Sequence, residues 1–186
     1  MKENSLFGYL KTAFILLCIC ALSAALLGAI NSITSPIIEA ANIERTEEMI
    51  KTIFPEYSSY QELEYKENGI SSVKSIENSK GEIVGYIVEA TISGFKDAIN
   101  IMVGLEKNAT VKSVKIISHS ETPGLGSKIT GEDYLQKYVG KSGVITFESG
   151  IDSLSGATLS SSSVLEGVNL AIKTCEQIAK EDSDER

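Results

Sequence analysis

The feature that most constrains this chain is an uninterrupted apolar stretch near its N-terminus. Residues 12–30 include no charged side chain. A helix of this length, at about 1.5 Å per residue, extends roughly 28 Å, close to the hydrocarbon thickness of a bilayer. The stretch therefore predicts a transmembrane helix over residues 12–30, with the lipid bilayer as a partner.

The charges on either side of the stretch predict its direction. Lys2 and Lys11 precede it, whereas acidic residues outnumber basic ones in the segment that follows. Positively charged flanks tend to stay in the cytoplasm. We therefore expect residues 1–11 in the cytoplasm and the rest of the chain outside, in a protein that crosses the cell membrane once.

A cleaved signal peptide is the alternative interpretation of the apolar stretch. Signal peptides typically have an apolar region of about 7–15 residues that ends in a site of small residues. The stretch here is longer, and Ser23-Ala24-Ala25 lies inside it rather than at its end. Both observations favour an uncleaved anchor.

Composition restricts what the remaining residues can bind. The formal net charge is −8, which argues against nucleic acid as a partner because phosphate backbones require clustered Lys and Arg. Cys18, Cys20 and Cys175 form no C-x-x-C pair, and His119 is the sole histidine. No iron–sulfur cluster, attached haem or structural metal is therefore expected. If the chain transfers electrons, an organic cofactor has to carry them.

Residues 70–180 have the pattern of a single α+β domain. Segments rich in β-branched residues and separated by short turns predict a mainly antiparallel sheet. The expected strands are residues 73–77, 82–92, 98–105, 110–118 and a short one at 145–147. A short helix is predicted at 131–139. An amphipathic helix should run from Ser161 or Ser162 to about Ala179, with Ser163 and Glu166 at capping-box spacing.

The anchor and the domain are expected to be joined by residues 31–69. Within this segment, residues 37–54 have an imperfect apolar face and predict a connecting helix that Pro55 ends. This helix is expected to serve either as a stalk or as a docking helix. Residues 56–69 are polar, aromatic and turn-like, and indicate a linker. A loop at Gly94-Phe95 interrupts two strands, in a place suited to a ligand. Residues 181–186 form a charged tail.

The first motif with a chemical interpretation ends in a hydroxyl group. It is Ser155-Gly156-Ala157-Thr158, preceded by Asp152. Thr158 stands just ahead of the final helix, whose N-terminal N–H groups favour a phosphate. Gly156 and Ala157 leave access to the hydroxyl, and Asp152 either orients the turn or is read by a modifying enzyme. The alternative is an ordinary turn and helix cap.

The second motif is a glycine- and proline-rich loop. It contains Glu121, Thr122, Pro123, Gly124, Leu125 and Gly126, and His119 precedes it. Such a loop lets backbone amides approach a planar ligand closely, although a tight surface turn is the alternative. Taken singly, His119 is more often structural than catalytic, and Glu121 is more often a solvated acid.

Together, the two motifs resemble those of the FMN-binding domains in the Rnf and Nqr respiratory complexes. The order and spacing of Thr122 and Thr158 match, and the similarity covers roughly residues 81–179 together with the anchor. The resemblance implies an α+β fold and FMN joined through its phosphate to Thr158. It also implies that the loop at 119–126 lines the isoalloxazine ring.

The similarity is greater to the G subunit of Rnf-type ion-translocating ferredoxin:NAD oxidoreductases than to NqrC, its Nqr counterpart, which is usually longer. It implies an electron carrier without catalytic residues, bound metal or turnover of its own. The implied partners are the other subunits of a membrane complex and a flavin transferase. An NqrC-type protein, another membrane-anchored FMN module and a non-redox anchored binding domain remain as alternatives.

Overall fold

The structure is a computed structural model that describes residues 3–65 and 67–184. The predicted N-terminal segment and charged tail lie partly outside these residues, at 1–2 and 185–186. The chain divides into two units, Met1–Met49 and Ile50–Arg186. Helix α1 (Glu3–Ile53) supplies the first unit, and its last turn belongs to the second.

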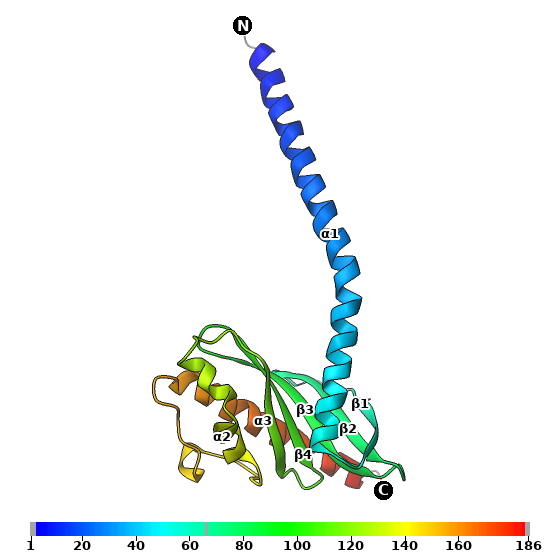
Figure 1. Cartoon of the computed structure of the whole chain (residues 1–186), viewed down its shortest axis with the longest axis vertical. Coiled ribbons are helices and arrows are strands. Elements are labelled where there is room, and N and C mark those ends of the chain that lie inside the picture. Colours follow the sequence, from blue (N-terminus) through cyan, green and yellow to red (C-terminus); the bar gives the residue numbers. More distant parts are fainter. Residues whose placement is uncertain (1–2, 66, 185–186) are drawn as a thin grey trace. The chain divides into compact units, whose positions relative to one another are not determined.

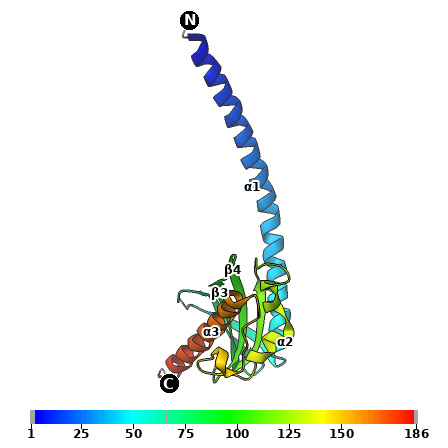
Figure 2. The same ribbon diagram turned by 90° about the vertical axis from the view of Figure 1, so that its left-hand side faces the viewer.

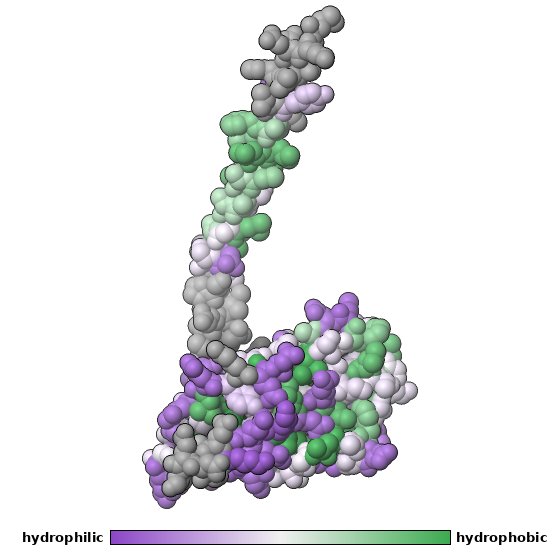
Figure 3. Space-filling view, turned by 180° about the vertical axis from the view of Figure 1, so that it is seen from behind, coloured by the Kyte–Doolittle hydropathy of each residue, from purple (hydrophilic) through white to green (hydrophobic). Residues whose placement is uncertain are grey.

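The apolar helix predicted at the N-terminus is present. From Ala13 to Ser32, α1 is long and apolar enough to cross a membrane, and it is the one such helix among the described residues. Its apolar side chains form the green band in Figure 3, and none of this span is buried. Burying one large apolar side chain is worth about 1.5–3 kcal/mol, so this surface is poorly suited to water.

Helix α1 does not break at the polar positions that follow the apolar stretch. Its backbone is helical through Pro36 to Ile53. Ser32 donates its hydroxyl to the carbonyl of Ala29 and Thr34 donates to that of Ile30, each at 2.9 Å. Serine and threonine inside a helix can satisfy their hydroxyl groups in this way, by a hydrogen bond to a carbonyl of the preceding turn. The helix predicted at 37–54 is therefore the last part of one continuous helix, which ends before Pro55 as expected.

Among the described residues, five strands form an antiparallel meander in the order β1-β2-β3-β4-β5 (Figure 1). They are β1 (Tyr57–Leu63), β2 (Ile70–Asn78), β3 (Ile83–Ser93), β4 (Ala98–Glu106) and β5 (Val111–Ser118). The antiparallel sheet is confirmed, but the linker predicted at 56–69 contains the edge strand β1. Strand β1 lies at the edge of the sheet and has mostly polar, exposed side chains, so its sequence lacks the alternation of apolar and polar residues that predicts a strand.

Helix α3 (Thr158–Asp184) covers one face of the sheet (Figures 1 and 2). Val164, Val168 and Ile172 pack there against the apolar side chains of β3 and β4. The helix begins before Ser161 or Ser162, where it was predicted to start, and extends past Ala179. Ser163 consequently lies inside α3, so the predicted capping box with Glu166 is wrong.

Short helical turns connect β5 to α3. They are η1 (Gly126–Thr130), α2 (Glu132–Leu135), η2 (Gln136–Tyr138) and η3 (Phe147–Ser149). The helix predicted at 131–139 is thus present as α2 and η2, whereas the strand predicted at 145–147 is wrong. The side chain of Asn169 bonds both the N–H and the carbonyl of Ile145, each at 2.8 Å. These are the backbone groups that a neighbouring strand would otherwise pair.

The other face of the sheet is covered by the end of α1. Ile50, Ile53 and Phe54 are buried there, with Phe54 only 1% exposed. Gly85 and Gly104 leave space on the sheet for these side chains. A Cβ at Gly104 would lie 2.7 Å from Cγ2 of Ile53, and one at Gly85 would meet the Phe54 ring. The compact unit therefore extends N-terminally of residue 70, where the domain was expected to begin.

Candidate functional site

The two sequence motifs meet at the start of α3, where they line a cleft of about 340 Å³. Glu121, Thr122, Leu125 and Gly126 come from the glycine-rich loop, and residues 156–160 come from the turn and the helix. Phe95, between β3 and β4, supplies another wall. Segments far apart in the sequence therefore converge on one small volume.

Thr158 is the first residue of α3, and it is exposed. The carbonyl of Ala157 accepts the N–H of Ser161 at 2.9 Å, which closes the first helical turn. The first N–H groups of a helix have no acceptor within it, and they carry the positive end of the helix dipole. The Thr158 hydroxyl thus stands at a position that favours a negatively charged group.

The turn before α3 depends on Gly156. Its φ is 78°, in the left-handed region that favours glycine. The N–H of Ala157 donates to the carbonyl of Leu154 at 2.9 Å. The Ser161 hydroxyl accepts the N–H of Leu154 at 3.0 Å and donates to the carbonyl of Ala157 at 2.9 Å. The turn is thereby fixed to the helix behind it.

The glycine-rich loop is held by its own backbone. The carbonyl of Thr122 accepts the N–H groups of Leu125 and Ser127 at 3.3 and 3.2 Å. Gly124 has a φ of 77°, and its N–H donates to Oγ of Ser127 at 2.9 Å. Pro123 and Gly124 lie exposed at the loop tip. The loop therefore presents Leu125 toward the cleft in a defined backbone conformation.

Three exposed apolar side chains line the cleft. Phe95 is 66% exposed, Leu159 is 61% exposed and Leu125 is 47% exposed. Their grouping matters because large apolar side chains rarely gather on a surface without a ligand or partner. A Cβ at Gly156 would lie 3.3 Å from Cδ2 of Leu125, so the two motifs touch here. The walls suit a flat apolar group.

Glu121 lies buried beneath these walls, at 4% exposure, and is not a solvated loop acid. Its Oε2 accepts the hydroxyl of Ser160 at 2.7 Å. Its Oε1 accepts the N–H groups of Phe95 and Lys96 at 2.8 and 3.3 Å. Burial raises the pKa of the Glu121 carboxyl, but these hydrogen bonds outweigh burial and hold the pKa below its ordinary value.

Other predicted site residues support the cleft from outside it. His119, Asp152 and Ser155 are not among the described residues that line the cleft. Nδ1 of His119 accepts the N–H of Glu121 at 3.1 Å, which fixes the start of the loop. Asp152 is exposed and forms an ion pair with Lys137 at 3.0 Å, just before the turn. This arrangement fits a structural role for both residues.

Sequence reasoning missed the part played by the serine run. Ser160 and Ser161 are buried, and they bond Glu121 and the turn respectively. The buried Ser163 hydroxyl donates to the carbonyl of Ser93 at 2.7 Å, which ties α3 to the end of β3. Consecutive hydroxyls on the apolar side of a helix could have indicated buried hydrogen bonds. The placement of Phe95 beside the cleft agrees with the loop expected at that position.

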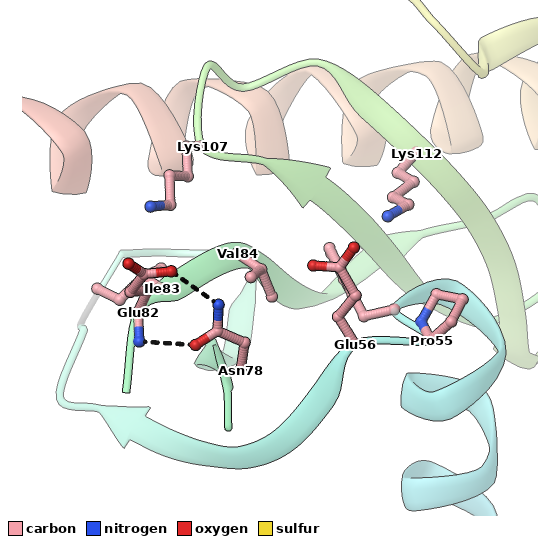
Figure 4. Close-up of a pocket in the computed structure, with 9 residues that line it drawn as sticks. Pro55, Glu56, Asn78, Glu82, Ile83, Val84, Lys107 and Lys112 are labelled. Atoms are coloured by element: carbon pink, nitrogen blue, oxygen red, sulfur yellow. Dashed lines mark hydrogen bonds between the residues drawn. The ribbon is translucent and has the colours of Figure 1, made fainter. Parts of the chain in front are cut away.

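Another hollow of about 340 Å³ lies away from both motifs (Figure 4). Asn78 lines it, donating its amide to Oε2 of Glu82 at 2.9 Å and accepting the N–H of Glu82 at 3.0 Å. The ammonium of Lys112 lies 4.5 Å from the centre of the Phe54 ring. These groups serve a turn and the packing of Phe54, so the cleft at Thr158 is the better candidate site.

Comparison with protein families bears directly on this cleft. Residues 94–173 match the FMN-binding domain family. The chain carries an FMN-binding domain. The matched residues include Phe95, the glycine-rich loop and Thr158, so every wall of the cleft belongs to the FMN-binding domain.

Curated relatives match nearly the whole chain, including the segment that precedes the FMN-binding domain. The G subunit of the ion-translocating oxidoreductase complex of Methanosarcina acetivorans is 29% identical over 87% of this chain and 92% of the relative. The G subunit of the Na(+)-translocating ferredoxin:NAD(+) oxidoreductase complex of Acetobacterium woodii is 28% identical, over 91% and 93% respectively. The corresponding protein of the proton-translocating complex of Clostridium ljungdahlii is 24% identical, over 92% of each chain.

Two solved structures align with part of this chain. The crystal structure of NqrC from Shewanella oneidensis aligns with a TM-score of 0.47 at 20% identity, covering 57% of this chain and 61% of that one. The C subunit of the Na(+)-translocating NADH-quinone reductase from Parabacteroides distasonis aligns with a TM-score of 0.45 at 19% identity, covering 56% and 62%.

Proposed function

We propose that this chain is a membrane-anchored electron-transfer subunit that carries FMN covalently on Thr158. The observation that carries the proposal is the position of the Thr158 hydroxyl. Thr158 is exposed, is the first residue of α3, and lines the cleft of an FMN-binding domain. Bound FMN supplies reversible uptake and release of electrons, and the protein supplies attachment, orientation and electrostatic environment.

The chemistry of the cleft suits FMN. The cleft volume of about 340 Å³ lies within the range of small-molecule sites, about 300–1,000 Å³. Phe95, Leu125 and Leu159 offer apolar surface for a ring system. The N–H groups at the start of α3 favour the charge of a phosphate on the Thr158 oxygen. Gly156, in the turn before α3, has no side chain to fill the cleft.

A phosphoester at Thr158 would fix the cofactor without altering its ring. The attachment also prevents dissociation on the outer side of a membrane, where lost FMN is not easily replaced. We propose that a separate flavin transferase installs the group from FAD: the pyrophosphate bond of FAD breaks, the FMN phosphate joins the Thr158 oxygen as its hydroxyl proton is lost, and AMP leaves. Thr158 is then a tether and not a catalytic nucleophile, and the protein has no turnover of its own.

We further propose that the protein works within an ion-translocating oxidoreductase complex of the Rnf type. Support comes from relatives that match over about nine-tenths of the chain and are named as the G subunits of such complexes. Sodium and protons both occur in the names of these relatives. The other subunits of the complex are the proposed donors and acceptors of electrons.

The proposed location is the cell membrane, with residues 1–11 cytoplasmic and the FMN-binding domain outside. The intact chain is expected to stay with membranes until detergent is added, because the apolar side chains of Ala13–Ser32 have no protein cover. A chain that begins after Ser32 keeps Ile50, Ile53 and Phe54 and should be soluble. Ultracentrifugation of both chains measures this, and full-length protein in the detergent-free supernatant would contradict the anchor.

Intact-mass spectrometry and in-gel flavin fluorescence test covalent attachment. The full chain, co-expressed with a flavin transferase, is expected to gain the mass of one FMN less one water. The added mass should map to the peptide that contains Thr158. An unmodified chain, beside a control substrate that the same transferase flavinylates, would contradict the proposal and favour a non-redox anchored binding domain.

A further inference from the structure

One buried carboxylate joins the three segments that form the cleft. Oε1 of Glu121 holds the N–H groups of Phe95 and Lys96, and Oε2 holds the hydroxyl of Ser160 at the start of α3. The backbone of Glu121 itself begins the glycine-rich loop, where its N–H donates to His119. Removing this single side chain would break all three hydrogen bonds by which the loop holds the Phe95 wall and the start of α3.

The space around the carboxylate is shaped to hold it. A Cβ at Gly126 would lie 2.7 Å from Oε2 of Glu121, and one at Gly94 would collide with Oε1. Two glycines on different segments therefore leave the space that the carboxylate occupies. Such close packing is expected of a group whose position is fixed before any ligand arrives.

The charge of Glu121 is stabilised mainly by hydrogen bonds, and the neighbouring His119 adds a smaller Coulombic contribution. Its hydrogen-bond donors are two backbone N–H groups and one hydroxyl, all neutral. None of the ion pairs found among the described residues involves Glu121. A carboxylate held in this way stays ionised and leaves a net negative charge beneath the cleft. Charges interact more strongly away from bulk water, so this charge acts on whatever occupies the cleft.

We propose that Glu121 is the positioning residue of the flavin cleft, and that its fixed charge lowers the reduction potential of the bound FMN. The inference rests on the proposed function. The carboxylate sets the positions of Phe95 and Ser160, so that the walls are formed before attachment. The same negative charge opposes the arrival of electrons on the cofactor.

Two substitutions separate the hydrogen bonds from the charge. In Glu121→Gln the side-chain carbonyl can still accept from Phe95, and the amide can donate to Ser160, whose hydroxyl also accepts. This variant removes the charge and keeps the connections. Glu121→Ala removes both. Glu166→Gln, at an exposed glutamate farther along α3, is the matched control for the loss of one negative charge.

The test measures the rate of FMN attachment to the full chain and the midpoint potential of the loaded protein. Glu121→Gln is expected to be loaded like the native chain and to show a higher midpoint potential, whereas Glu166→Gln matches the native chain in both. Glu121→Ala should lose at least about tenfold in attachment rate, since hydrogen bonds to a charged group are lost.

The outcomes distinguish this inference from the proposed function. A native chain that takes up no covalent FMN contradicts the proposed function itself. If the native chain is loaded and FMN-loaded Glu121→Gln has the same midpoint potential, the electrostatic role is overturned. Attachment to Glu121→Ala at the native rate overturns the positioning role. If Glu121→Ala does not fold, Ser160→Ala replaces it, because that change removes one of the three hydrogen bonds.

Discussion

Replacing Thr158 with valine is expected to abolish covalent FMN while the domain stays folded. Valine nearly matches threonine in shape but has no hydroxyl to form the phosphoester. Thr158 is exposed, and substitutions at exposed positions usually change stability by less than about 0.5 kcal/mol. Intact mass reports the attachment, and circular dichroism with a thermal melt reports the fold.

Two further variants make this result specific to the Thr158 hydroxyl. Ser155→Ala removes an exposed hydroxyl from the same turn and is expected to be loaded normally. Thr158→Ser keeps a hydroxyl and should retain some attachment; complete loss would mean that the transferase reads the methyl group. Covalent flavin on Thr158→Val would place the attachment at another residue and remove the central observation of the proposed function.

The second large effect is expected at Phe54, which is far from the cleft along the chain. Phe54→Ala should lower the free energy of unfolding by about 3–5 kcal/mol, as for other large-to-small changes in a core. The ring is 1% exposed and fills the space that Gly85 leaves on the sheet. The opposing position, Gly85, has no side chain that could expand into the cavity.

Chemical denaturation of the full chain in detergent measures this loss, with domain unfolding followed by tyrosine fluorescence. Phe95→Ala is the matched control, since that phenylalanine is 66% exposed and its loss should change stability little. Equal stability of Phe54→Ala and the native chain would show that the end of α1 is not part of the domain core.

The two predictions concern different parts of one unit, and they differ in how well the sequence anticipates them. The importance of Thr158 follows from a motif whose chemistry is local: a hydroxyl, small neighbours and a helix start. The importance of Phe54 does not, because residues 37–54 have the pattern of a connecting helix. The burial of Ile50, Ile53 and Phe54 against the sheet shows that this helix ends inside the core.

Errors in the predicted elements have similar causes. Strand β1 escapes prediction because it lies at the edge of the sheet, where one side faces water and alternation is weak. The predicted start of α3 is too late because serine and threonine have poor helix propensity. In the structure, buried hydrogen bonds from Ser160, Ser161 and Ser163 offset that preference. No strand forms at 145–147, where the side chain of Asn169 makes hydrogen bonds to the backbone N–H and carbonyl of Ile145.

The sequence by itself determined the apolar N-terminal helix, the antiparallel sheet and the two motifs, because each depends on a pattern within a few neighbouring residues. Tertiary structure alone decided which motif residues line the cleft, that Glu121 is buried beneath it, and that Phe54 belongs to the core. Those features depend on contacts between segments far apart in the sequence. Local preferences do not encode such contacts, which appear only when the sheet and α3 are packed together.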